Sequence, residues 1–130
     1  MLAIIGGSGL TQLSNMEIER REVARTPYGE PSGALAFGRM CNEPVVFLAR
    51  HGYGHTIPPH LVNYRANIWA LKELKVEGIV SVATVGGIRA DLGPGALGPL
   101  QRAPHRGLVG HALGGVGAGN PQCLDLAVGG

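Results

Sequence analysis

The chain has 130 residues, of which 45% are hydrophobic and 15% are charged. This length and apolar content fit one globular domain and exclude a wholly disordered chain, while the two cysteines exclude a multi-bridge disulfide framework. The net charge of +2 is unclustered, and no apolar run approaches the ~18 residues of a membrane span. We therefore expect no nucleic-acid or membrane partner, no signal peptide and a cytoplasmic location.

The first 50 residues have strand patterns separated by turn chemistry. Residues 2–5 are apolar and end at two glycines, which predicts a buried strand. Residues 16–23 are polar and predict an edge strand. Two β-rich runs, residues 34–39 and 44–49, flank a turn and predict a hairpin whose second strand is central in the sheet.

A helix is predicted over residues 60–75, just after Pro58-Pro59, because proline is tolerated where a helix begins. Residues 79–84 follow as another apolar strand. Strand, helix and strand in this order predict a βαβ unit with a parallel pair of strands. The apolar stripe expected to pack this helix on the core consists of Leu61, Ile68, Leu71 and Leu74.

Three loops follow the carboxyl ends of predicted strands, at residues 6–9, 50–55 and 83–87. In open α/β sheets, ligands bind at this edge. The free amides of the first loop and the Ser8 hydroxyl suit an anion such as phosphate. A plain glycine-rich turn is the alternative interpretation, because the last glycine of a dinucleotide fingerprint would fall at Gln12.

The second loop carries the strongest candidate side chains. Arg50 offers a planar fork for bidentate phosphate contact, and His51 can add a donor. The alternative is a solvated arginine beside a packed histidine. The third loop offers the Thr84 hydroxyl, or is a plain strand end. No carboxylate with metal-ligand spacing accompanies His51 and His55, so no metal site is expected.

Residues 98–130 differ in composition from the rest of the chain. They are rich in Gly, Pro, Ala and Leu, and Asp125 is their only acidic residue. No period of a helix or strand persists, so we expect this tail to be poorly ordered. A flexible linker is one alternative. A frameshift or truncation just after Leu97 is the other.

Several motifs resemble one known family, in the same order along residues 2–97. Residues 4–10 resemble the opening of the purine nucleoside phosphorylases that act on 5'-methylthioadenosine. Residues 26–32 resemble their Thr-Pro-x-Gly-x-Pro-Ser turn. The most specific similarity covers residues 47–52 and 62–72. Gly86-Gly87-Ile88 and Pro58-Pro59-His60 resemble the bacterial branch that prefers methylthioinosine.

The resemblance implies a partial phosphorylase-type α/β fold, a mixed β-sheet flanked by helices, in residues 1–97. It implies phosphorolysis of a methylthio-purine nucleoside to a purine and 5-methylthioribose 1-phosphate. Phosphate is a co-substrate, and no cofactor is expected. The base-handling Asp is expected beyond the similar residues. The residues that the resemblance assigns to phosphate binding are Ser8, Arg50, His51, Ala83 and Thr84.

The same resemblance implies a ribose-side role for His55 and a homotrimer in which the helix over residues 60–72 lies near the subunit contact. Two alternatives from other classes remain open. One is a truncated, catalytically inactive fragment that binds phosphate or a nucleotide. The other is a nicotinamide-dependent oxidoreductase, which the incomplete glycine pattern disfavours.

Overall fold

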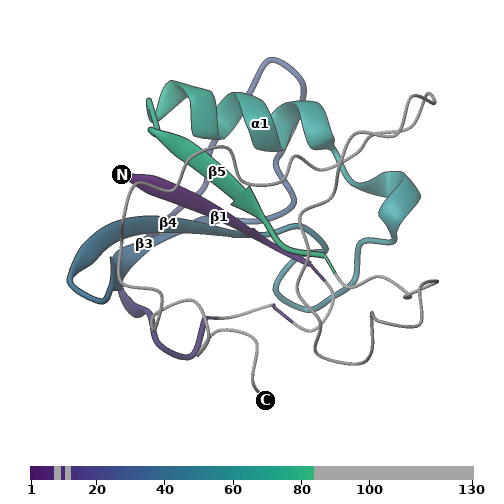
Figure 1. The fold of residues 1–130 in the computed structure, drawn as a ribbon. Coiled ribbons are helices and arrows are strands. Elements are labelled where there is room, and N and C mark those ends of the chain that lie inside the picture. Colours follow the sequence, from purple (N-terminus) through teal and green to yellow (C-terminus); the bar gives the residue numbers. More distant parts are fainter. Residues whose placement is uncertain (8–9, 11–12, 84–130) are drawn as a thin grey trace, which may run out of the picture.

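The strands of this chain form one mixed sheet in the order β2-β3-β4-β1-β5 (Figure 1). The computed structural model describes residues 1–7, 10 and 13–83. The elements in chain order are β1 (Leu2–Gly6), β2 (Glu17–Glu22), β3 (Leu35–Met40), β4 (Glu43–Ala49), the 3-10 helix η1 (Pro59–Leu61), α1 (Tyr64–Glu73) and β5 (Gly78–Ser81).

The strand β1 lies between β4 and β5 and is parallel to both. Ile5 is in register with Leu48 of β4 on one side and with Ser81 of β5 on the other. The predicted parallel direction of β4 and β5 is confirmed. The expectation that these two strands pair with each other is wrong, because β1 is inserted between them. The predicted hairpin of β3 and β4 is present, and β2 is the edge strand expected from its polar residues.

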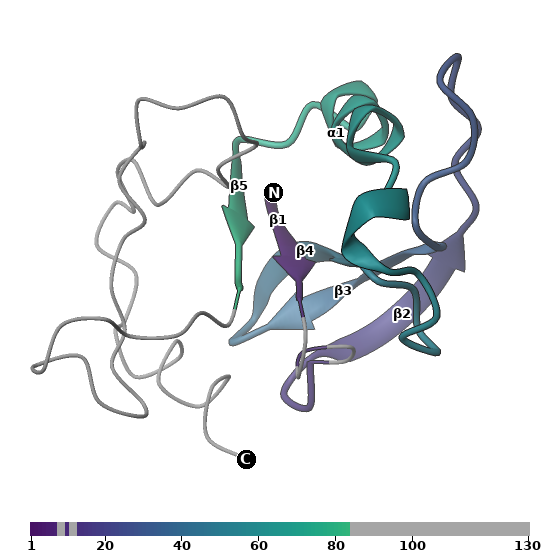
Figure 2. The same cartoon turned by 90° about the vertical axis from the view of Figure 1, so that its right-hand side faces the viewer.

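Side chains alternate along the strands, so the sheet buries a cluster on each face. Ile5 and Leu48 pack on one face with Leu71 of α1, which lies over that face (Figure 2). Ile4 and Phe47 pack on the other face. Both faces of β4 are covered, so the side chains of its second half must be apolar on either side. This explains the continuous apolar run in that strand.

The α-helix begins later than the sequence predicts. Asn63 caps it, because its side-chain Oδ1 accepts a hydrogen bond from the N–H of Ala66 at 3.1 Å. Pro59 and Leu61 instead belong to η1, and the Leu61 side chain is 66% exposed. Ile68 is 48% exposed. The predicted core stripe is therefore wrong at Leu61 and at Ile68. The residues that α1 buries are Ala66, Asn67, Ala70 and Leu71.

The predicted boundary at residue 97 and the tail over residues 98–130 lie outside the described residues. The strand expected over residues 79–84 is β5, which ends earlier, at Ser81. Within the described part of the chain, α1 is far too short to cross a bilayer, and no other helix there has the length and apolar character to do so.

Candidate functional site

Three parallel strands end side by side at one edge of the sheet, where backbone hydrogen bonds continue beyond the strands themselves (Figure 1). The N–H of Arg50, after β4, donates to the Gly6 carbonyl at 2.9 Å. The N–H of Val82, after β5, donates to the Ile5 carbonyl at 2.9 Å. The loops that follow β4, β1 and β5 therefore start next to one another. They lie at the edge of the sheet where ligands bind in α/β proteins.

Gly7 lies directly beneath the Arg50 side chain. A Cβ atom at position 7 would overlap the Arg50 Nη2 atom and would stand 2.7 Å from the Val82 carbonyl oxygen. A side chain here would force the Arg50 guanidinium or the Val82 backbone to shift. Arg50 is half-buried, so its cation is held against the backbone of the β1 loop rather than extended into solvent.

His51 is almost completely buried, at 5% exposure, and both of its ring nitrogens have partners. Nδ1 lies 2.8 Å from the Ile57 carbonyl oxygen. Nε2 accepts from Nε of Arg50 at 3.4 Å. The backbone closes the same loop, because the Ile57 N–H donates to the His51 carbonyl at 3.1 Å. The ring is thus fixed between the loop and the arginine.

His55 lies beside this buried ring but on the surface. Its ring centroid is 5.0 Å from that of His51, with the planes tilted by 54°. Its φ of 52° is in the left-handed region, so the backbone turns sharply there. Within residues 1–7, 10 and 13–83, no three His, Cys, Asp or Glu side chains gather as a metal site would require.

Asn67 of α1 supports the loop from behind and was not singled out as a site residue by its sequence position. It is buried and makes two hydrogen bonds with Ser32, whose carbonyl oxygen would lie 3.4 Å from a Cβ at Gly52. The turn before β3 therefore packs directly on the loop that carries Arg50 and His51. The only signal of Asn67 in the sequence is that a polar residue lies on an otherwise apolar helix face.

Tyr53 closes the other side of this loop. Its hydroxyl donates to the Ala34 carbonyl at 2.9 Å, and the Arg21 guanidinium carbon lies 4.6 Å from its ring centroid. Burial raises the pKa of Tyr53 above its usual value, and the nearby Arg21 charge opposes that shift. The loop is consequently fixed at Tyr53 as well as at His51.

The structure brings two of the predicted phosphate residues, Arg50 and His51, into direct contact. Ala83 is exposed and follows Val82 at the end of β5, next to the same edge of the sheet. Ser8 and Thr84 lie outside the described residues. Their predicted roles, and the ribose-side role of His55, stay predictions.

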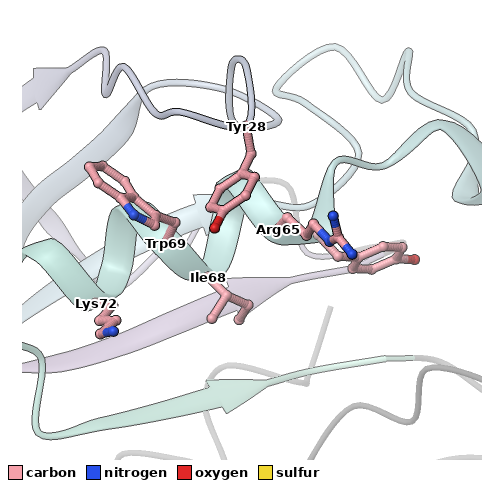
Figure 3. Close-up of a pocket in the computed structure, with 6 residues that line it drawn as sticks. Tyr28, Arg65, Ile68, Trp69 and Lys72 are labelled. Atoms are coloured by element: carbon pink, nitrogen blue, oxygen red, sulfur yellow. The ribbon is translucent and has the colours of Figure 1, made fainter.

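A second surface feature lies on α1, apart from the strand ends. A groove of about 590 Å³ separates the helix from the turn before β3. Figure 3 shows Tyr28 of that turn lying over α1 between Trp69 and Arg65. The residues lining the groove are Tyr28, Tyr64, Arg65, Ile68, Trp69 and Lys72.

Fold and geometry together define an α/β protein with a half-buried arginine and a buried histidine in contact at the carboxyl ends of parallel strands. Residues 1–99 match the model of the phosphorylase superfamily, and the chain belongs to that family. The resemblance inferred from its motifs is confirmed, as is the mixed phosphorylase-type sheet.

Two curated relatives are similar over almost the same stretch. A probable S-methyl-5'-thioinosine phosphorylase from Pseudomonas syringae pv. tomato is 54% identical over 93 residues, which cover 72% of this chain and 38% of that protein. An S-methyl-5'-thioadenosine phosphorylase from Hyperthermus butylicus is 51% identical over 94 residues, which cover 72% of this chain and 34% of that protein. The chain therefore spans little more than a third of the length of either relative.

A solved structure shares the fold. A mutant adenosine/methylthioadenosine phosphorylase from Schistosoma mansoni, in its apo form, superposes with a TM-score of 0.68 at 42% sequence identity. The superposed part covers 72% of this chain and 32% of that one.

Proposed function

We propose that the protein is a purine nucleoside phosphorylase that acts on S-methyl-5'-thioinosine or S-methyl-5'-thioadenosine. The products are a purine and 5-methylthioribose 1-phosphate. One observation carries the proposal: the Arg50 guanidinium is held over Gly7 where β1, β4 and β5 end. Relatives named for either nucleoside are similar to this chain to nearly the same extent, so both remain candidate substrates.

Phosphate is the ligand that this site suits best. A guanidinium binds two oxygens of an oxyanion through parallel N–H groups, and Arg50 is already fixed in place by its contacts. We assign the hydroxyls of Ser8 and Thr84 and the backbone at Ala83 to the same anion, with His51 beside Arg50. No organic cofactor is part of the proposal.

The chemistry follows from the charge of the bound anion. In phosphorolysis the bond between C1' and the purine nitrogen breaks as a phosphate oxygen bonds to C1', and positive charge develops on the sugar. A phosphate fixed at the strand ends would stabilise that charge. His55, on the exposed side of the loop, is proposed to face the ribose. The leaving purine needs a proton or hydrogen bond, which we assign to an Asp beyond the matched residues.

We further propose a cytoplasmic homotrimer whose subunits meet at the groove on α1. Tyr28 is 51% exposed and Ile68 is 48% exposed there, beside Trp69. Large exposed apolar side chains clustered at one place are typical of protein–protein contacts. This supports the subunit contact expected for the helix over residues 60–72.

A second candidate is a fragment that binds phosphate or a nucleotide without catalysis. The observation that favours it is the coverage: the similar residues correspond to 38% of the thioinosine relative. Those residues contain the proposed phosphate loops, whereas the group that would handle the purine is expected elsewhere. The two candidates predict the same anion binding and differ in turnover.

The test combines turnover and binding on the full 130-residue chain. Methylthioinosine, methylthioadenosine and inosine are incubated with and without phosphate, and purine release is followed by chromatography. Phosphate binding is measured by calorimetry for the wild type, Arg50→Ala and the control Arg25→Ala, which removes an exposed arginine. Phosphate-dependent purine release supports the enzyme.

Binding that Arg50→Ala weakens about 10- to 100-fold, without turnover, supports the fragment, since a hydrogen bond to a charged group contributes ~1.5–3 kcal/mol. Neither binding nor turnover in the wild type would contradict both candidates. An equal loss in Arg25→Ala would show that the effect is one of net charge rather than of this site.

A further inference from the structure

We infer that His51 acts as a positioning residue that orients Arg50, in the neutral form, and does not itself donate to the phosphate. This inference rests on the anion site proposed above. It concerns the protons on the two ring nitrogens of His51 and the edge of the guanidinium that they leave open.

The first step is the tautomer. A carbonyl oxygen only accepts hydrogen bonds, so the 2.8 Å contact between Nδ1 of His51 and the Ile57 carbonyl requires a proton on Nδ1. A neutral imidazole has one N–H, so Nε2 carries a lone pair. That lone pair accepts from Nε of Arg50 at 3.4 Å. Both nitrogens of the neutral ring are therefore occupied, and neither has a proton left for an anion.

The second step concerns Arg50. A guanidinium can offer an anion either the edge formed by Nε and Nη2 or the edge formed by its two Nη atoms. The contact with His51 engages Nε, and Nη2 lies over Gly7 at the strand ends. His51 thereby blocks the first edge and leaves the pair of Nη atoms for the oxyanion.

Protonation of His51 would reverse this arrangement. Nε2 would then carry a proton facing the N–H of Arg50, and two cations would be in contact. The arginine would have to turn away from the strand ends. The titratable or charged side chains in contact with His51 in the described part of the chain are Arg50 and His55.

The two possible roles of His51 give opposite pH dependences. A positioning residue loses its acceptor when protonated, so anion affinity falls as the pH falls. A direct donor gains a proton and a charge, so anion affinity rises. Sulfate is the appropriate probe because, unlike phosphate, it keeps its charge between about pH 5 and 8, where histidine titrates. The measurements use the full chain with His55→Gln, which removes the imidazole beside His51.

We expect sulfate to bind about tenfold more weakly at the acid end of this range than at the alkaline end, which corresponds to ~1.4 kcal/mol. His51→Gln keeps an acceptor for Arg50 and does not titrate, so its sulfate affinity should not change with pH. Stronger or unchanged binding by the His51 protein at acid pH would overturn the inference. No sulfate binding at any pH would overturn the anion site itself.

A second measurement reads the tautomer without any ligand. Two-bond ¹H–¹⁵N spectra of the ¹⁵N-labelled chain at the alkaline end should show a protonated Nδ1 and an unprotonated Nε2 for His51, with and without sulfate. In Arg50→Ala, the Nε2 resonance should move toward that of an unbonded nitrogen. A proton on Nε2 that forms when sulfate is added would establish direct donation and exclude the positioning role.

Discussion

Asn67 and Ser32 are joined by two buried hydrogen bonds. The Ser32 N–H donates to the Asn67 Oδ1 atom at 2.8 Å, and the Asn67 amide donates to the Ser32 hydroxyl at 2.9 Å. One side chain of α1 thus satisfies two polar groups of a turn that packs on Gly52. The helix, the turn and the loop of the candidate site are consequently one connected unit.

Replacing Asn67 with alanine should destabilise the protein strongly. The substitution leaves the buried N–H and hydroxyl of Ser32 without partners, and each unsatisfied group costs about 1–3 kcal/mol. Urea unfolding monitored by circular dichroism measures the change. Asn15→Ala, at an exposed turn position, is the matched control and should change the free energy of unfolding by less than about 0.5 kcal/mol. Equal effects at the two positions would contradict the role of Asn67.

Replacing Gly7 with alanine should move the Arg50 guanidinium. The new methyl group would overlap Nη2 and approach the Val82 carbonyl to 2.7 Å. We expect a loss of stability of about 1–3 kcal/mol from the overlap. Phosphate affinity, measured by calorimetry, should fall about tenfold because the arginine leaves its position.

Gly54→Ala is the control for this substitution. Gly54 lies in the same loop as Arg50, and among the described residues a Cβ there would meet only the methyl group of Thr56, at 3.3 Å. This variant should keep the phosphate affinity of the wild type. If Gly7→Ala also kept it, the close contact between Gly7 and Arg50 would have no role in binding.

Tyr53 should make stability depend on pH in the alkaline range. Burial raises its pKa in the folded state above the usual value of 10.0, so the folded protein holds this proton more tightly than the unfolded chain. The stabilisation is complete below pH ~10 and is lost as the pH rises through the folded-state pKa. Tyr53→Phe should therefore lose less stability than the wild type between about pH 9 and 11.

Denaturant unfolding at several pH values measures that difference. At neutral pH the Phe variant should be less stable by about 0.5–1.5 kcal/mol, since the hydrogen bond to the Ala34 carbonyl is removed. Tyr28→Phe is the matched control, because it removes the hydroxyl of an exposed tyrosine. Parallel slopes for the wild type and Tyr53→Phe would contradict the shift.

Replacing Ile68 with glutamate should dissociate the proposed trimer. A carboxylate placed in the groove beside Trp69 would be buried in a subunit contact, at a cost of several kcal/mol. Light scattering coupled to size exclusion gives the mass. Val23→Glu, at a position 74% exposed outside the groove, should leave the mass unchanged. A wild-type monomer, or a trimer that survives Ile68→Glu, would exclude this contact.

The strands could be predicted because the residues that form them carry their own signal. The apolar run of β4 and the polar residues of β2 reflect a covered and an exposed position, which act locally. The order of the strands could not be predicted, because the insertion of β1 between β4 and β5 depends on pairing between distant residues. The helix start was missed because Asn63, rather than the prolines before it, supplies the cap.

Some features of the candidate site could likewise be predicted from the sequence, and others could not. Arg50 and His51 were found because they follow an apolar strand at the edge where ligands bind. The contact between Asn67 and Ser32 joins residues 35 positions apart, and the tautomer of His51 depends on the carbonyl of Ile57. Neither relation leaves a periodic pattern in the chain. Hydrogen-bond partners of buried groups become visible only once the backbone is folded.

The position of β1 between β4 and β5 affects how the polypeptide can be made. Leu2 aligns with Val45 on one side and with Gly78 on the other, so this strand leaves the ribosome long before either neighbour exists. Pairing over such separations is slow, and an unpaired apolar strand is prone to association in the meantime. Nascent chains halted before β5 should therefore engage a chaperone through their first residues.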